Sequence, residues 1–276
     1  TQNSLELVSN LSGQTSSATL LATMDQSLTS MGGRMLYQWL THPLLVREQI
    51  MERQDGVGEL VSDPSWTQSI RSLMAGVKDM ERTLSRLNYG VANARDLVNL
   101  KLFLERVPEL QSVLKRSRSL ILKQILQSLN PFPALREMIA RAIVEAPPLS
   151  LKEGGLIRDG FRPALDELRN ISKNGKSWLL EFQQREIERT GIKSLRVKYS
   201  QVFGYSLEIS KSNLHLVPPD YIRRQTLANA ERFIVPELKS WDEKISGAEE
   251  KIKALEYEIF NELRGKIVEE LSGLQA

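Results

Sequence analysis

One apolar face near the C-terminal end of the chain constrains the fold more than any other feature of the sequence. Beyond Pro236, apolar residues recur at alternating intervals of three and four, and then of four: Leu238, Trp241, Ile245, Ala248, Ile252, Leu255, Ile259, Leu263, Ile267 and Leu271. This spacing is typical of a helix that packs along its length as in a coiled coil, here about 55 Å long. Because Gly247 and Gly265 each weaken a helix by about 1 kcal/mol relative to alanine, packing against other elements must stabilise it.

A second long helical segment precedes this one. Residues 162–191 would form a helix of about 45 Å, and Gly191 is well placed to end it. Upstream, over residues 18–147, apolar residues recur every three or four positions, which predicts successive shorter helices with one buried face each. The sequence EAPPLSLKEGGLIRDG, residues 145–160, is rich in proline and glycine and predicts a connector.

The stretch between the two long segments has the alternation of β-strands. Apolar and polar residues alternate over 195–200 and again over 205–210, which predicts a hairpin with one apolar and one polar face. Further strands are predicted near 223–227 and 231–234. A small sheet would thus be inserted between two long helices that run antiparallel to each other.

The predicted fold class is therefore mainly α. It is a multi-helical lever or core domain in which two long antiparallel helices carry a small inserted antiparallel β-sheet. The helical domain is predicted to be discontinuous, over residues 1–175 and 236–276, and the inserted domain is predicted over residues 176–235. A sheet held about 45 Å from the main core adds little to that core, but it can reach around a partner.

The predicted insertion is also basic. Residues 176–235 contain ten basic and six acidic residues, an excess of four positive charges, whereas the whole chain has a net charge of only +3. Its RRQTLANAERF segment mixes cations with polar side chains that can bind phosphates, so the charge pattern permits a sequence-independent, salt-sensitive contact with a nucleic acid backbone. The alternatives are a solvated sheet face and a helical structural module whose basic sheet binds protein.

The sequence indicates no active site. There is no cysteine and the two histidines, His42 and His215, lie far apart, so no catalytic residue and no metal site is predicted. The tripeptide GKS at 175–177 invites comparison with a P-loop. However, Asn170 stands where that motif needs a glycine, and the tripeptide lies inside a long helical segment.

Nothing in the sequence predicts a membrane protein. No apolar run approaches the roughly 20 residues that cross a bilayer, and the first residues lack the features of a signal peptide. The absence of cysteine is consistent with an intracellular protein.

The ordered series of motifs resembles the MutS family of DNA mismatch-repair proteins, in particular its core (lever) domain with an inserted clamp. The most specific match is FGYSLEISKSN…PPDYIRRQTLANAERFIVPELKSWDEKI, over residues 203–245. Upstream matches are TLLATMDQSLTSMGGRMLYQWLTHPLL (19–45), DMERTLSRL (79–87) and ARDL (94–97). ERTGIKSLRVKYSQVFGY, at the entry to the clamp, also matches, and the resemblance covers essentially the whole chain.

This resemblance implies a dimer that encircles double-stranded DNA, with clamps that hold the backbone nonspecifically and levers that couple DNA binding to a C-terminal ATPase. By position, the family's backbone contacts correspond to Ser200 and Gln201, and to Thr226, Ala228 and Asn229. The charge pattern adds three further candidates: Lys198, Lys211 and Arg232. A MutS paralogue that acts in recombination is an alternative to a mismatch-repair protein.

The chain is expected to be a piece of the whole protein. It stops after the long helix, before the ATPase, and begins after the mismatch-reading domain, so the fragment is expected to lack enzymatic activity and cofactors. ATP and magnesium are expected in the intact protein. The implied partners are a second copy of the protein and a MutL-like repair protein, and the implied location is the bacterial cytoplasm near the nucleoid, or another intracellular compartment with DNA. Two departures from the family pattern, Lys198 and Ser206, both lie on the predicted polar face of the hairpin.

Overall fold

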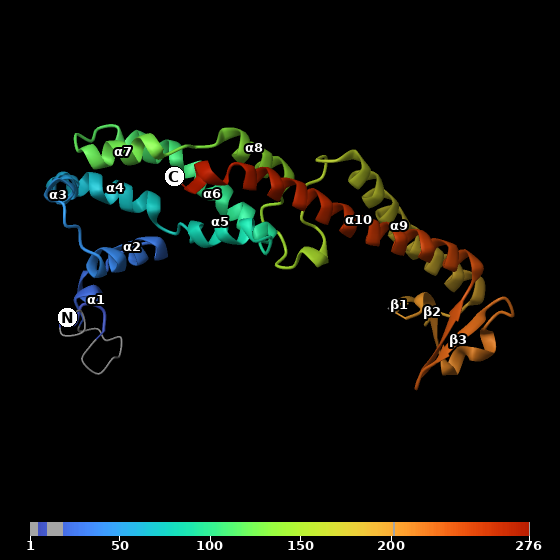
Figure 1. Ribbon diagram of the computed structural model, residues 1–276. Helices are drawn as coiled ribbons and strands as arrows, with labels where there is room; N and C mark the ends of the chain where they lie inside the picture. The colour runs from blue at the N-terminus through green and yellow to red at the C-terminus, as the bar shows by residue number, and fades with distance from the viewer. Residues whose placement is uncertain (1–4, 10–18, 201, 276) are drawn as a thin grey trace. The chain divides into compact units, whose positions relative to one another are not determined.

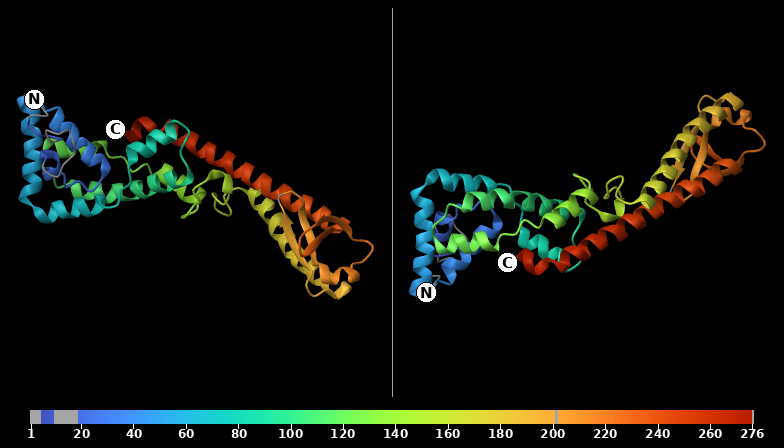
Figure 2. Two further views of the ribbon diagram at one scale, coloured as in Figure 1. Left: turned by 90° about the horizontal axis from the view of Figure 1, so that it is seen from below. Right: turned by 90° about the horizontal axis from the view of Figure 1, so that it is seen from above.

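The computed structural model describes residues 5–9, 19–200 and 202–275. Over these residues the protein is mainly helical, with one small antiparallel sheet, as the sequence predicts (Figures 1 and 2). The helices are α1 (Leu20–Met24), α2 (Ser30–Thr41), α3 (Arg47–Ser62), α4 (Pro64–Met74), α5 (Met80–Asn88), α6 (Ala94–Leu114), α7 (Leu120–Ser128), α8 (Pro133–Ala142), α9 (Pro163–Thr190), α10 (Pro236–Glu269) and α11 (Leu271–Gln275). Two short 3-10 helices are η1 (Leu151–Glu153) and η2 (Lys211–Leu216). No helix among the described residues is long and apolar enough to cross a membrane.

The chain divides into two compact units. Unit 1 takes in the described residues up to Leu149 and from Phe260 onward, and unit 2 is Ser150–Ile259. The core of unit 1 is built on α6, which begins with a capping box between Asn93 and Asp96 and contacts α4, α5, α7 and α8. Buried apolar residues of α6 recur every three or four positions: Leu97, Leu100, Leu104, Val107, Leu110 and Leu114.

The first helices of unit 1 differ from the expectation that each buries an apolar face. Among the described residues of α1, α2 and α3, only Thr41 and Gly56 are buried, and neither has an apolar side chain; Gly56 packs near α7. Met35 and Trp39, on the apolar side of α2, are 55% and 39% exposed. The spacing identified the apolar side of this helix, but it carried no information on what covers that side.

In unit 2, α9 and α10 form the predicted antiparallel pair. Two ion pairs show that the helices run in opposite directions. Lys176 of α9 bonds to Glu249 of α10 at 2.8 Å, and Arg185, further along α9, bonds to Glu237, nearer the start of α10, at 2.7 Å. Figure 2 shows the two helices side by side in both views. The rings of Trp178 in α9 and Trp241 in α10 stack between these ion pairs, with centroids 4.9 Å apart.

The sheet contains four strands in the order β1-β2-β4-β3, all antiparallel. The strands are β1 (Arg196–Ser200), β2 (Gly204–Ser210), β3 (Ile222–Thr226) and β4 (Ala230–Ile234). One face lies on the helix pair. Leu207, Ile209 and Phe233 from this face are buried in one cluster with helix residues that include Leu179, Phe182, Leu238 and Ile245. Strands and long helices share this core, so packing does not separate an inserted domain from the helices that carry it. The predicted limits of that domain, 176–235, stay a prediction.

Candidate nucleic-acid interface

The strand register places the two turns of the sheet at opposite ends. The β1–β2 turn joins Ser200 to Gly204, which are paired, whereas the β3–β4 turn lies beside the other end of β2, where Ser210 pairs with Ala230. Six residue-to-residue steps along β2 separate the two ends, a span of roughly 20 Å. The predicted contact residues therefore fall into two separate groups, one at each turn. Gln201 lies outside the described residues.

The β1–β2 turn is fixed against α10. Gly204 has φ of +70°, a left-handed conformation that glycine adopts without strain. Next to it, the backbone N–H of Tyr205 donates to Asp242 Oδ1 at 3.3 Å, and Ser246 Oγ donates to the same oxygen at 3.2 Å. Ser200, the predicted contact at this turn, is partly buried.

The β3–β4 turn presents the second predicted group to solvent. Thr226, Ala228 and Asn229 are all exposed, and the N–H of Leu227 closes the turn by donating to the carbonyl of Ala230 at 2.8 Å. The carbonyl of Asn229 accepts a hydrogen bond of 3.1 Å from the backbone N–H of Lys211. The structure thus brings Lys211, selected from charge alone, to the turn that carries the other three residues.

Arg232, another residue selected from charge, is engaged within the sheet. Its Nε donates to Glu208 Oε2 and its Nη1 donates to Gln225 Oε1, both at 3.1 Å, and its side chain is only 19% exposed. These three residues are cross-strand neighbours on the polar face. Because Glu208 already balances the charge of Arg232, we expect this arginine to contribute little to phosphate binding.

A β-bulge gives Arg224 a different position. The register of β3 shifts between Arg223 and Gln225, so Arg224 stands outside the ladder, is exposed, and has no carboxylate partner among the described residues. Its neighbour Arg223 pairs with Glu231 at 3.5 Å. Bulges often re-aim a side chain beside a functional site. Sequence reasoning missed Arg224, because alternation gives no sign of a bulge within the arginine pair.

The basic residues of segment 176–235 separate into two sets. Five are bound to carboxylates: Lys176, Arg185, Arg189, Arg223 and Arg232. Five have no carboxylate partner within the described part of the chain: Lys193, Arg196, Lys198, Lys211 and Arg224. The second set lies on the sheet, on the loop before β1 and at the start of η2, and all five side chains are exposed. The excess positive charge of the segment is therefore concentrated on the sheet.

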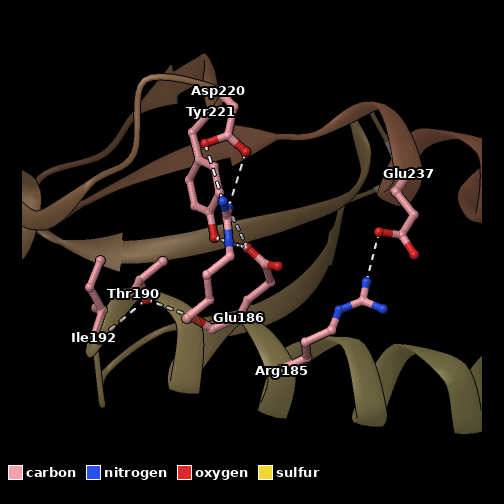
Figure 3. Close-up of polar contacts among 8 residues, drawn as sticks. Arg185, Glu186, Thr190, Ile192, Asp220, Tyr221 and Glu237 are labelled. Carbon is pink, nitrogen blue, oxygen red and sulfur yellow. Dashed lines mark hydrogen bonds and ion pairs between the residues drawn. The ribbon is translucent and has the colours of Figure 1, made fainter.

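A partly buried polar network fixes the start of β3 to the end of α9 (Figure 3). The hydroxyl of Tyr221 donates to Glu186 Oε2 at 2.6 Å, and Arg189 bridges Glu186 at 2.7 Å and Asp220 at 3.1 Å. Burial raises the pKa of Tyr221, and the hydrogen bond to the Glu186 carboxylate raises it further, so the phenol stays protonated. The strand that carries Arg224 and Thr226 is thus attached to the end of α9.

Two features of the described residues bear on metal and nucleotide binding. No three or more histidine, aspartate and glutamate side chains among them are grouped to hold a metal ion. The GKS tripeptide lies within α9, where Lys176 bonds to Glu249 and Gly175 packs closely on Ile245. With the lysine engaged and the backbone helical, this tripeptide does not fit a nucleotide phosphate.

Comparisons with known proteins give a consistent result. A family model described as MutS domain III matches residues 1–276. The curated relatives include the DNA mismatch repair protein MutS of Symbiobacterium thermophilum, 46% identical over 275 residues that cover 100% of this chain and 31% of the relative. The MutS protein of Methanosarcina acetivorans is 48% identical over 267 residues, which cover 95% of this chain and 30% of the relative. The MutS protein of Myxococcus xanthus is 45% identical over 264 residues, which cover 96% of this chain and 30% of the relative. The chain spans about a third of the length of the curated relatives it matches.

Proposed function

This chain belongs to the MutS domain III family, found in DNA mismatch-repair proteins, and we propose that its sheet is a clamp that holds the backbone of duplex DNA without reading the base sequence. The observation that carries the proposal is the set of five exposed cations on the sheet and the segments beside it, which have no carboxylate partner among the residues that the structure describes. Beside them, the β3–β4 turn offers the side chains of Thr226 and Asn229. Cations and small polar groups of this kind position a protein on phosphates but carry no sequence information.

In this proposal the α9–α10 pair is the lever of the whole protein. Ion pairs and stacked rings join the two helices at several points, so a displacement at one end of the pair is transmitted to the sheet. The whole protein would bind ATP and magnesium in an ATPase outside this chain, act with a second copy of itself, and work with a MutL-like repair protein. The relatives are named mismatch-repair proteins, which does not favour a role in recombination.

Binding of this chain to duplex DNA should be weak and steeply dependent on salt. Fluorescence anisotropy with labelled duplexes between about 50 and 200 mM salt should give a linear fall of the logarithm of the association constant with the logarithm of salt concentration. The slope should be about −0.9 for each phosphate that is neutralised, and it should be equal for matched and mismatched duplexes. No binding at about 50 mM salt would contradict the proposal and favour a protein-interaction module. A preference for the mismatch would contradict a clamp that holds the backbone without reading the bases.

Arg224 and Arg232 lie in different environments on the sheet, so replacing each by alanine should have a different effect. Arg224→Ala should weaken binding to every duplex alike and make the salt slope less steep by about 1, because it removes one phosphate contact. Arg232→Ala should leave the slope unchanged and lower stability instead, because it leaves Glu208 partly buried without its partner. Lys251→Ala, an exposed change on α10, is the control for net charge. A larger change of slope for Arg232→Ala than for Arg224→Ala would contradict this assignment.

A further inference from the structure

Four small polar side chains form one hydrogen-bonded cluster at the end of β2 that lies beside the β3–β4 turn. Ser210 Oγ lies 3.2 Å from Ser194 Oγ and 3.1 Å from Ser212 Oγ. Asn213 Nδ2 donates to Ser194 Oγ at 2.8 Å and to Ser210 Oγ at 3.2 Å. This serine–asparagine cluster joins three segments that are separate in the sequence: the loop before β1, the end of β2, and η2.

The cluster has a hydrogen-bond donor to spare. Each serine hydroxyl carries one hydrogen, so the three serines supply three, and both Asn213 bonds use hydrogens of the amide. Only two contacts join hydroxyl to hydroxyl, Ser194 with Ser210 and Ser210 with Ser212. Among the described residues, one hydroxyl hydrogen is therefore left for an acceptor outside the cluster.

The surroundings of the cluster favour an anionic acceptor. Lys193 and Lys211 directly adjoin its members in sequence, are exposed, and have no carboxylate partner in the described part of the chain. The acidic residues of the neighbouring strands are engaged: Glu208 with Arg232, and Glu231 with Arg223. The charge that remains near the cluster is positive.

The cluster also adjoins the proposed DNA contact. Ser210 pairs with Ala230, and the N–H of Lys211 binds the carbonyl of Asn229 in the β3–β4 turn. The β1–β2 turn lies roughly 20 Å away along β2. Successive phosphates of one DNA strand are about 3.4 Å apart along the helix axis, so the two ends of the sheet would meet different phosphates.

We propose that the serine–asparagine cluster, with Lys193 and Lys211, is a phosphate-binding point for the DNA backbone. This inference rests on the proposed function, because the phosphate it binds belongs to the duplex held by the sheet. The two lysines supply charge, while the spare hydroxyl hydrogen is donated to a phosphate oxygen and sets the position of the backbone.

The test separates charge from hydrogen bonding by two variants of the whole chain. Lys193→Ala with Lys211→Ala should make the salt slope less steep by about 2, one for each lysine. Ser210→Ala with Ser212→Ala and Asn213→Ala should weaken binding about fivefold at all salt concentrations and leave the slope unchanged, because neutral donors release no counterions. The matched charge control is Lys251→Ala with Lys253→Ala, two exposed residues of α10 that lie outside the sheet.

The outcomes distinguish this inference from the function on which it rests. The parent chain could bind DNA while the Lys193/Lys211 and Lys251/Lys253 double variants change the salt slope equally. That result would exclude the cluster as a phosphate-binding point but leave the clamp proposal standing. If the parent chain does not bind at about 50 mM salt, both fail. Unchanged affinity of a folded serine–asparagine variant would rule out the cluster as a phosphate ligand. If that variant does not fold, Ser212→Ala alone, which removes a single hydroxyl contact, replaces it.

Discussion

Replacing Glu256 by alanine should lower the free energy of unfolding of unit 2 by about 3–5 kcal/mol, the usual effect of breaking a buried ion pair from one side. The side chain of Glu256 is fully buried in α10. It accepts a hydrogen bond of 2.5 Å from Arg169 Nη2 in α9 and one of 3.0 Å from the backbone N–H of Leu156. Without the carboxylate, the guanidinium of Arg169, only 22% exposed, keeps Asp159 at 2.6 Å and the Ile157 carbonyl at 2.7 Å but loses its buried ionic partner. The Leu156 amide loses its acceptor.

The measurement is urea unfolding followed by tryptophan fluorescence, because Trp178 and Trp241 both lie in unit 2. Glu258→Ala, two residues further along α10 and exposed, is the matched control and should change stability by no more than about 0.5 kcal/mol. Equal losses for the Glu256 and Glu258 variants would show that the buried pair does not stabilise the unit.

Gly204→Ala should lower stability by about 2–3 kcal/mol. The left-handed conformation of residue 204, with φ of +70°, strains any residue with a side chain by about 1–2 kcal/mol. In addition, the new methyl group would overlap the carboxylate of Asp242. That carboxylate would have to leave the Tyr205 N–H and Ser246, which would cost about 1 kcal/mol more.

Gly191 provides a matched control for the Gly204 variant. Its φ of +71° is nearly the same, but nothing lies within 4 Å of the position that a Cβ would occupy. Gly191→Ala should therefore show the conformational strain alone. Combining Gly204→Ala with Asp242→Ala should recover part of the loss, and thermal denaturation by circular dichroism measures all three variants. Identical melting temperatures for the Gly191 and Gly204 single variants would exclude the steric contribution of Asp242.

Much of unit 2 can be predicted from sequence because its elements have strong local signals. Pro236 and Gly191 mark helix ends in the structure as expected, and the alternation over 195–200 and 205–210 corresponds to β1 and β2. The two later strands, β3 and β4, also lie where they were predicted. The antiparallel pairing of α9 with α10 was predictable as well. Each helix has a long apolar face, and the short sheet between them brings the chain back along the first helix.

The interface was less predictable, because partners across strands decide which charges are available. Arg232 and Arg224 are indistinguishable by charge, yet one lies between Glu208 and Gln225 and the other stands on a bulge. Ser206 likewise falls on the predicted polar face but is buried, and its hydroxyl donates to the carbonyl of Lys198 at 3.4 Å. The register between strands decides which residues are neighbours. The sequence pattern within a single strand does not predict that register.

The hydrogen bond between Leu156 and Glu256 also has a consequence for the order in which unit 2 folds. Its two ends are 100 residues apart in the chain, and every strand lies between them. Closing so long a loop reduces chain entropy before any contact repays it, which slows folding. A ribosome releases β1–β4 before α10, so the apolar face of the sheet has only α9 to cover it until Leu238 and Ile245 emerge. The strands are synthesised early but reach their final packing late.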